Sequence, residues 1–500
     1  MKQTLLFKDL LTHGLEKDLY RLNPWWHGLP QEELPPFKRW AFRTALERLR
    51  TGLTKATVVT GPRQVGKSTL MRQIIQTLLD DGTNPKHIFY VQFDELEELL
   101  DLKGESPILR LADWFEKQLL GKTFNEAARA GQQVYLFLDE VQNLSSWAPQ
   151  LKFLVDNSAV RVMVTGSSAL RIEQGRDSLA GRISTLEMGT LFLREIMGIR
   201  GEGQLESYLP FNGLSSLRDK NFWVGLRQFG LKHCNLRNRA FAAFSERGAY
   251  PIAHARADRP WSELADLLNE TVIYRAIRHD LRFGRKGVRR DEHLLEEVFR
   301  LSCRYIGQSP RQALYLDEIK RAMAANIGWQ RILSYLKFLD GTLLIRLIEP
   351  LELRLKKVRG PSKLCLCDHA LRASWLQEVV PLDADSLERQ THLRDMAGHI
   401  AESVAGYFLK SLTNLDVAHF PERQAEPEVD FILTVGEQRI PLEVKYRTHI
   451  DWQDTRGLRS FIERTVYNAP FGVLVTLTDD TVIDDPRIIS VPLSTLLLMR

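Results

Sequence analysis

Residues 61–69 constrain the fold of this chain more than any other segment. They read glycine, four further residues, then Gly66-Lys67-Ser68, directly after the apolar run 57–60 and before a segment of helical periodicity. A strand, a glycine-bearing loop and a helix in this order direct backbone N–H groups and the positive end of the helix at a phosphate. The sequence therefore predicts a phosphate-binding loop in an α/β domain with a parallel sheet. Its candidate residues are Gly61, Pro62, Arg63, Gln64, Val65, Gly66, Lys67, Ser68 and Thr69.

A second motif stands at the end of the apolar run 134–138, which is followed by Asp139 and Glu140. In phosphate-loop proteins the first carboxylate of such a pair holds Mg²⁺, and the second is placed to polarise the attacking water. We expect Lys67 to reach the terminal phosphates and Ser68 to ligate Mg²⁺. Together the two motifs predict hydrolysis of a bound nucleotide with Mg²⁺ as cofactor, not binding alone.

Further polar candidates follow the next apolar run, 160–165. Thr165 or Ser167 could sense the terminal phosphate, and an ordinary polar strand end is the alternative. Arg176 and Arg182 are candidates for an arginine that reaches into a neighbouring subunit's site and stabilises the charge of the transition state. A structural ion pair is the alternative for either arginine.

Five strings occur in a fixed order along the chain: Asn23-Pro24-Trp25-Trp26, the loop 61–69, Leu138-Asp139-Glu140-Val141-Gln142, Thr165-Gly166-Ser167-Ser168-Ala169 and Leu179-Ala180-Gly181-Arg182. This set resembles the prokaryotic AAA-type ATPases, most clearly over residues 57–190. The resemblance implies ATP and Mg²⁺ as ligands, and an ATPase core followed by a winged-helix region and a C-terminal domain of poorly defined function. An arginine acting in trans would imply a homo-oligomer, and a hexamer is usual among AAA-type relatives.

The composition, with 44% hydrophobic and 26% charged residues and a net charge of +5, indicates a globular chain. Its length of 500 residues predicts several domains. The four cysteines are too few and too scattered for a disulfide framework or a zinc site. We expect a cytoplasmic protein without a membrane partner, because no secretory signal or membrane span is evident. The expected domains are a helical lead-in (1–50), the AAA-type core (51–193), a helical extension (194–290), a winged helix-turn-helix (291–375) and a small α/β domain (395–500).

The last of these domains carries a second set of candidate residues. After a predicted helix at 395–412 come three strand candidates, 417–420, 429–435 and 439–445. Glu443 and Lys445 share one face of the third strand, and Asp430 lies opposite the apolar face of the second. Carboxylates that hold Mg²⁺ or Mn²⁺ beside a lysine that activates water are suited to phosphodiester cleavage.

The order Asp430, Glu443, Lys445, with Glu402 on the preceding helix, resembles the restriction-endonuclease-like superfamily, especially archaeal-type Holliday junction resolvases. The resemblance implies Asp430 and Glu443 as metal ligands and a catalytic role for all four residues. A solvated, charged strand edge is the alternative, above all for Glu402.

Basic residues suggest DNA as a partner, because clusters that neutralise phosphates give binding that is independent of sequence. Two functions follow. One is an ATP-driven enzyme that remodels or processes DNA, branched DNA included, with a metal-dependent nuclease-like domain. The alternative is a nucleotide-controlled regulatory switch or assembly protein whose nuclease-like domain is inactive. The basic residues are Arg275, Arg278, His279, Arg282, Arg285, Lys286, Arg289 and Arg290 before the winged helix, and Arg354, Lys356, Lys357, Arg359 and Lys363 in its expected wing.

Overall fold

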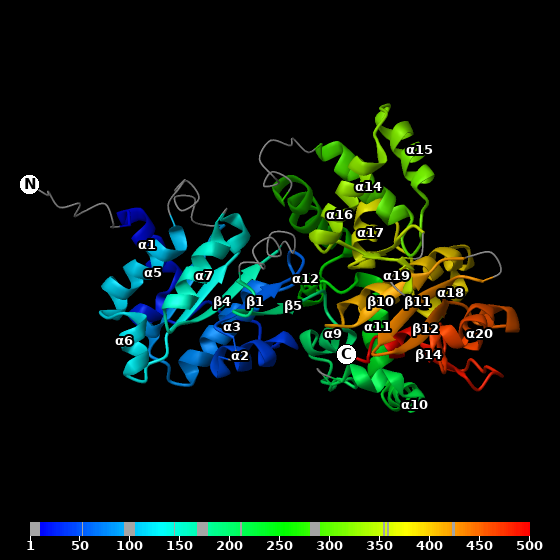
Figure 1. The fold of residues 1–500 in the computed structure, drawn as a ribbon, viewed down its shortest axis with the longest axis horizontal. Coiled ribbons are helices and arrows are strands. Elements are labelled where there is room, and N and C mark those ends of the chain that lie inside the picture. Colours follow the sequence, from blue (N-terminus) through cyan, green and yellow to red (C-terminus); the bar gives the residue numbers. More distant parts are fainter. Residues whose placement is uncertain are drawn as a thin grey trace, which may run out of the picture. The chain divides into compact units, whose positions relative to one another are not determined.

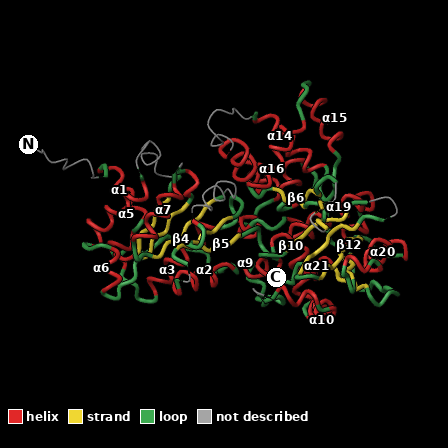
Figure 2. The backbone as a smooth tube through the Cα atoms, viewed as in Figure 1, coloured by secondary structure: helices red, strands yellow, loops and turns green. Residues whose placement is uncertain are grey.

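The computed structural model divides into two compact units, Met1–Met188 and Gly189–Arg500, each of which is considered by itself. Each unit contains a five-stranded sheet, and Figure 2 shows the strands of both sheets in yellow among red helices. The structure describes residues 11–52, 54–94, 106–144, 146–167, 179–210, 213–280, 291–353, 356–357, 360–422 and 426–500.

The sheet of the N-terminal unit is parallel throughout, with the strand order β2-β3-β4-β1-β5. Three of its strands coincide with the apolar runs 57–60, 134–138 and 160–165 of the sequence. Nearly all residues of four strands are buried, whereas the edge strand β5 is mostly half-buried. Parallel sheets are covered on both faces, which is why these strands read as continuous apolar segments. The strands are β1 (Ala56–Thr60), β2 (Ile88–Gln92), β3 (Tyr135–Asp139), β4 (Arg161–Gly166) and β5 (Ile183–Glu187).

Helices cover both faces of this sheet (Figure 1). α2 (Ala41–Thr51) and α3 (Lys67–Asp80) lie on one side, and α7 (Trp147–Asn157) lies on the other, where it packs against α5 (Pro107–Phe115). Because all strands are parallel, their carboxyl ends meet at one edge. The loop after β1 lies at that edge, where the chain order of neighbouring strands reverses and ligands commonly bind.

The N-terminal lead-in covers the open edge of β2. α1 (His13–Leu22) is followed by Asn23, whose buried side chain donates to Leu19 O and Tyr90 O and accepts from Tyr90 N, each at 2.8 Å. The indoles of Trp25 and Trp26 both donate to Ile88 O, at 3.2 and 2.9 Å. An uncovered edge strand would leave these peptide groups without partners in a buried setting. The Asn23-Pro24-Trp25-Trp26 string therefore has a structural role.

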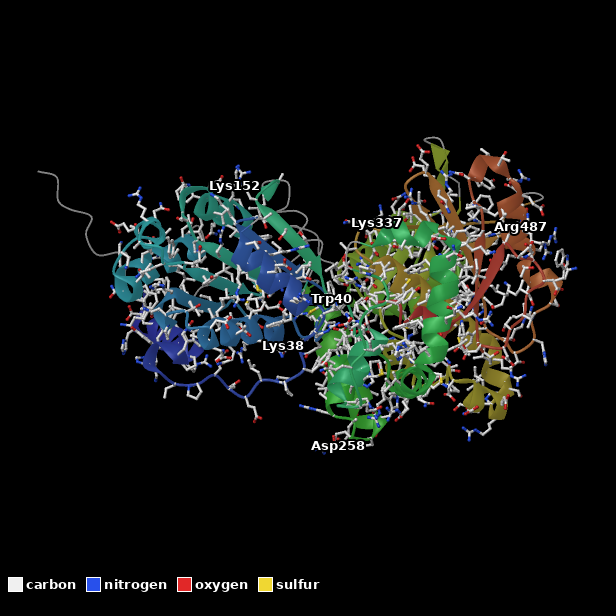
Figure 3. The ribbon with its side chains drawn as sticks, turned by 90° about the horizontal axis from the view of Figure 1, so that it is seen from below. Lys38, Trp40, Lys152, Asp258, Lys337 and Arg487 are labelled. Carbon is white, nitrogen blue, oxygen red and sulfur yellow. The ribbon has the colours of Figure 1, made fainter. Side chains whose placement is uncertain are left out.

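The end of the lead-in contacts the phosphate-binding loop. Lys38 and Trp40 lie at the start of α2 (Figure 3), and the Lys38 ammonium lies 4.3 Å from the centre of the Phe42 ring. Between them the buried Arg39 donates from Nη1 to Val65 O at 2.8 Å. Arg39 thus fixes the middle of the loop from outside the sheet.

The sheet of the C-terminal unit is mixed, with the order β10-β11-β12-β13-β14. β11 is antiparallel to both of its neighbours, β10 and β12, and β12, β13 and β14 are parallel. The predicted helix and three strands at the start of this region are all present. The elements are α19 (Arg394–Ser411), β10 (Asp416–Phe420), β11 (Val429–Val435), β12 (Gln438–Lys445), α20 (Arg456–Glu463), β13 (Gly472–Thr476), β14 (Ile488–Pro492) and α21 (Leu493–Leu496).

Between these regions lies a mostly helical stretch. Its last part has three helices and an antiparallel strand pair, β6 with β9, which is the element order of a winged helix-turn-helix; that assignment stays a prediction. No helix of the described residues is long and apolar enough to cross a bilayer. The elements are α9 (Leu193–Ile199), α10 (Lys220–Lys232), α11 (Cys234–Arg247), α12 (Pro251–Ala255), α13 (Trp261–Leu268), a π-helical segment (Asn269–Asp280), α14 (Glu292–Arg304), α15 (Gln312–Met323), α16 (Trp329–Gly341), β6 (Ile345–Ile348), β7 (Glu352–Leu353), β8 (Lys356–Lys357), β9 (Lys363–Leu366), α17 (His369–Leu376) and α18 (Ala384–Arg389).

Candidate functional site

The loop between β1 and α3 has the conformation that its glycines permit. Gly66, which directly precedes α3, has φ of 91°, and Gln64 has φ of 62°. A Cβ atom at Gly61 would lie 2.1 Å from the carbonyl oxygen of Met188, so no larger residue fits there without a shift of backbone. These constraints fix a tight turn that ends in a helix N-terminus, as the sequence predicts.

Lys67 opens α3 with its side chain folded over the loop. It is 4% exposed, and its ammonium donates to Gly61 O at 3.1 Å and Pro62 O at 2.7 Å. The positive charge is therefore held within the phosphate-binding loop, the position from which a lysine reaches the terminal phosphates of a nucleotide.

Asp139 lies buried at the carboxyl end of β3, surrounded by hydroxyl groups. Tyr90 Oη donates to its Oδ2 at 3.0 Å, Thr165 Oγ1 donates to its Oδ1, and the Ser68 hydroxyl is also hydrogen-bonded to it. Burial and the neighbouring Glu140 raise the pKa of Asp139, and the three hydroxyl groups oppose that rise. Ser68 and Asp139 thus present adjacent oxygen atoms, the ligand type that Mg²⁺ prefers.

Glu140 turns away from the strand in the left-handed region, with φ of 56°. Its N–H donates to Thr165 Oγ1 at 3.1 Å, and the Gln142 amide donates both to its carboxylate and to Ser167 Oγ. Since the hydroxyl proton of Thr165 is directed at Asp139, Thr165 here connects the two carboxylate-bearing residues. Its prediction as a phosphate sensor is not tested by this contact.

The two candidate arginines differ in outcome. Arg182 pairs with Asp156 within its own unit, with Nε 2.6 Å from Oδ1, as in the structural alternative. Arg176 lies outside the described residues, and so does Ser168.

Three residues of the site were not singled out from the sequence: Arg39, Tyr90 and Gln142. Gln142 alone had a local signal, since it stands two positions after Glu140.

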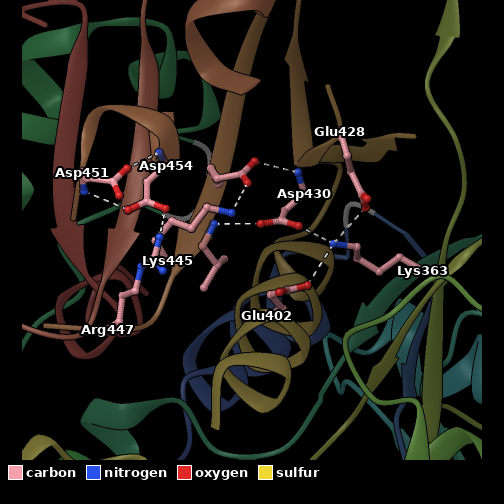
Figure 4. Close-up of polar contacts among 10 residues, drawn as sticks. Lys363, Glu402, Glu428, Asp430, Lys445, Arg447, Asp451 and Asp454 are labelled. Atoms are coloured by element: carbon pink, nitrogen blue, oxygen red, sulfur yellow. Dashed lines mark hydrogen bonds and ion pairs between the residues drawn. The ribbon is translucent and has the colours of Figure 1, made fainter. Parts of the chain in front are cut away.

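The acidic residues of the C-terminal unit converge as the strand pattern predicts (Figure 4). Asp430 on β11 lies next to Glu443 on β12, and its N–H donates to Glu443 Oε2 at 3.3 Å. The Lys445 ammonium donates to Glu443 Oε1 at 2.6 Å. Asp430 and Glu443 are both buried, so this group is not a solvated strand edge.

Lys363 changes the interpretation of this cluster. It was predicted to bind phosphates from an exposed wing, and that prediction is wrong: the residue starts β9, is 1% exposed and donates to Asp430 Oδ1 at 2.5 Å. Its ammonium also donates to Glu402 Oε2 at 3.1 Å, which draws Glu402 into the cluster rather than to solvent. A lysine among carboxylates is buried at low cost only as part of such a group.

Among the other basic residues named from the sequence, the structure describes the side chains of two. Arg275 and Arg278 are exposed, and the Arg278 guanidinium lies 4.5 Å from the centre of the Tyr274 ring. The side chains of the remaining basic residues lie outside the described part of the chain: His279, Arg282, Arg285, Lys286, Arg289, Arg290, Arg354, Lys356, Lys357 and Arg359.

The stability of the C-terminal unit is expected to depend on pH through Glu443. Burial first, then the charge of Asp430, raise the pKa of Glu443 to about 8 from 4.5, against the opposing effect of Lys445. The folded state thus retains a proton that the unfolded state releases, and this stabilisation is full below about pH 4.5 and lost as the pH rises to 8. Glu443→Gln keeps a neutral side chain, so its stability relative to the parent should rise from pH 5 to pH 8.5. Scanning calorimetry of both full-length proteins measures this difference, and a difference that is constant over that range contradicts the assignment.

Comparison with known families agrees with the geometry of the N-terminal unit. Residues 53–197 match the family model of an AAA domain, and residues 397–496 match the model of a domain of unknown function, DUF4143. The parallel sheet, the phosphate-binding loop and the Asp139–Glu140 pair lie in the first match. The N-terminal region is therefore an AAA-type ATPase domain, a class that binds nucleotides and usually Mg²⁺. The C-terminal domain matches the second model, whose description assigns no activity.

Relatives occur in archaea and bacteria. An uncharacterised protein of Methanocaldococcus jannaschii is 23% identical over 65% of this chain, and the chain spans 63% of its length. One of Haemophilus influenzae is 22% identical over 80% of this chain and 85% of its own length. One of Mycobacterium tuberculosis is 30% identical over 31% of this chain and 30% of its own. Among solved structures, the Walker-type ATPase PABY2304 of Pyrococcus abyssi is 14% identical, with a TM-score of 0.39 over 68% of this chain and 96% of its own.

Proposed function

We propose that the AAA-type domain binds ATP with Mg²⁺ and hydrolyses it. The observation that carries this proposal is the shared edge of the sheet at which Lys67, Ser68, Asp139 and Glu140 meet. The residues fit Mg²⁺, because Ser68 and Asp139 supply oxygen ligands and the buried carboxylate gains a counter-charge when the ion binds. Bound Mg²⁺ supplies charge neutralisation at the phosphates.

The residues of the chain divide the remaining tasks. Lys67 draws the terminal phosphates into the loop, and the α3 N-terminus adds N–H donors. Glu140 orients and polarises the attacking water. Thr165 and Gln142 hold Glu140 from its backbone and its carboxylate, so its direction is set before a nucleotide arrives. Fixing the polar groups in advance lowers the cost of reaching the transition state.

Assembly into a homo-oligomer, with a hexamer as the usual form, remains part of the proposal. Arg182 is held by Asp156, so a trans-acting role would require that ion pair to open. Arg176 is then the simpler candidate for the arginine that reaches a neighbouring site. An oligomer would bring its charge to the developing negative charge of the phosphoryl group.

For the whole chain, the leading proposal is an ATP-driven enzyme that acts on DNA, branched DNA included. Exposed Arg275 and Arg278 and the basic residues that follow them support phosphate contacts. The convergence of Asp430, Glu443 and Lys445 supports a nuclease-like fold for the last domain. Cleavage with Mg²⁺ or Mn²⁺ by these residues and Glu402 is the part of this proposal that the position of Lys363 argues against.

One observation favours the second proposal, a nucleotide-controlled switch or assembly protein with an inactive nuclease-like domain. The ammonium of Lys363 lies directly between Asp430 and Glu402. Moreover, no group of three or more His, Cys, Asp or Glu side chains in the described part of the chain is arranged to hold a metal ion. The ATPase role is common to both proposals.

One assay separates them. The full-length protein is incubated with flap, fork and four-way-junction DNA and Mg²⁺ or Mn²⁺, with and without ATP, beside an Asp430→Ala, Lys445→Ala double variant. A DNA-processing enzyme should show ATP turnover that rises several-fold with DNA, and cleavage by the parent alone would assign nuclease activity. If DNA does not change the rate of ATP turnover and neither protein cleaves DNA, the nucleotide-controlled switch is supported. Absence of any ATP uptake in a calorimetric titration contradicts both.

A further inference from the structure

A fully buried lysine, Lys363, contacts Asp430, one of the two carboxylates that the nuclease resemblance assigns to metal binding. Lys363 begins β9, which pairs with β6 and packs against α19, and this packing carries its side chain to the acidic cluster. Its Nζ atom lies 2.5 Å from Asp430 Oδ1, 3.1 Å from Glu402 Oε2 and 3.7 Å from Glu428 Oε1 (Figure 4). Three carboxylates from two elements and a preceding loop therefore share one ammonium.

The remaining oxygens of the two buried acids also have donors. Asp430 Oδ2 accepts from Val444 N at 2.9 Å, Glu443 Oε1 accepts from Lys445, and Glu443 Oε2 accepts from Asp430 N. Buried carboxylates are stable only when their oxygens are satisfied in this way. Each oxygen that a metal ion would take from Asp430 or Glu443 is thus already bound to an N–H group.

The residues consequently do not fit the divalent ion that the resemblance implies. Mg²⁺ needs several oxygens at about 2.1 Å in octahedral geometry. The Lys363 ammonium lies at the point where oxygens of Asp430 and Glu402 converge. A divalent cation beside it would be repelled by its positive charge, and burial strengthens this repulsion. The geometry accommodates one cation, and the chain supplies it.

The charges of the cluster are matched to this arrangement. Burial alone would lower the pKa of Lys363, but Asp430, Glu402 and Glu428 raise it well above its ordinary value. For Asp430, the two lysines outweigh the effect of burial and lower its pKa. Both shifts favour the charged forms of Lys363 and Asp430, in agreement with the short contact between them.

We propose that Lys363 is a built-in cation that replaces the divalent metal of the nuclease-like cluster, so that these acids fasten β9 to α19 and β11 instead of cutting DNA. Of the two lysines in the cluster, Lys363 bridges β9 to the sheet, whereas Lys445 pairs with Glu443 on its own strand. This proposal deepens the second function above and is independent of ATP hydrolysis.

The test measures binding of Mn²⁺ to the full-length chain in the absence of nucleotide. The electron paramagnetic resonance signal of the free ion reports how much Mn²⁺ remains unbound. The parent should take up no Mn²⁺ that depends on Asp430. Lys363→Ala vacates the position and should gain about one Mn²⁺ per chain, and an added Asp430→Asn change should remove that gain. Circular dichroism and ATP turnover check that the variants are folded.

Two results would overturn the proposal. One is Mn²⁺ uptake by the parent that Asp430→Asn abolishes, because the metal and Lys363 would then coexist. The other is a folded Lys363→Ala protein that takes up no Mn²⁺ at millimolar concentration. The first comparison does not depend on the folding of any Lys363 variant, and neither result bears on ATP turnover, so failure here is distinguishable from failure of the ATPase assignment.

Discussion

Glu140→Gln is expected to bind ATP as tightly as the parent and to hydrolyse it at least about 100-fold more slowly. The carboxylate acts on the attacking water, an interaction that matters in the transition state and not in the bound ground state. Glutamine preserves the size of the side chain, the backbone bond to Thr165 and an oxygen that can accept from Gln142. The variant therefore removes the charge of Glu140 with little change of structure.

Lys67→Ala is the companion variant, and we expect it to weaken ATP binding. The ammonium that would contact the terminal phosphates is lost, which should weaken ATP binding by about 10- to 100-fold. Calorimetric titration gives affinity and phosphate release gives turnover for both variants. Glu47→Gln, the same chemical change on the exposed face of α2, is the matched control and should behave as the parent. Parental turnover in Glu140→Gln, or parental uptake in Lys67→Ala, would contradict the site.

Local patterns predicted the framework well. The strands of the N-terminal sheet are short apolar runs because both faces of a parallel sheet are buried, and the run before the loop 61–69 becomes β1 for that reason. The loop itself and the position of the Asp139–Glu140 pair at the end of a strand were predictable because each motif consists of neighbouring residues. The C-terminal helix and strands followed from helical and alternating periodicity in the same way.

Contacts between distant segments were not predictable, and Lys363 shows why. A lysine beside Arg359 and Lys357 in sequence is expected at a solvated, phosphate-binding surface. Its burial depends on carboxylates contributed by α19 and the β11 region, which no local pattern connects to β9. The one local signal was the apolar strand that Lys363 begins. Tyr90 was missed for a related reason, because its hydroxyl reaches Asp139 from a neighbouring strand.

Asn23→Ala is expected to destabilise the edge of the N-terminal sheet by about 2–4 kcal/mol. The substitution removes three buried hydrogen bonds and leaves the Tyr90 N–H and C=O of β2 without partners. Each lost bond contributes about 1 kcal/mol, and a buried peptide group left unsatisfied costs about 1–3 kcal/mol. Because Tyr90 also donates to Asp139, loosening β2 should lower ATP turnover as well as stability.

Hydrogen exchange of peptides that cover β2 measures this effect in the intact protein, where amide protection reports the free energy of local opening. A loss of about 2 kcal/mol or more corresponds to at least about a 30-fold fall in protection. Asn125 provides the matched control, since its side chain also bonds two backbone groups, Asn157 O and Ala159 N, but on the exposed surface. Asn125→Ala should leave β2 exchange unchanged because water replaces the lost bonds. Equal effects of the two variants on β2 would show that the lead-in does not secure that strand.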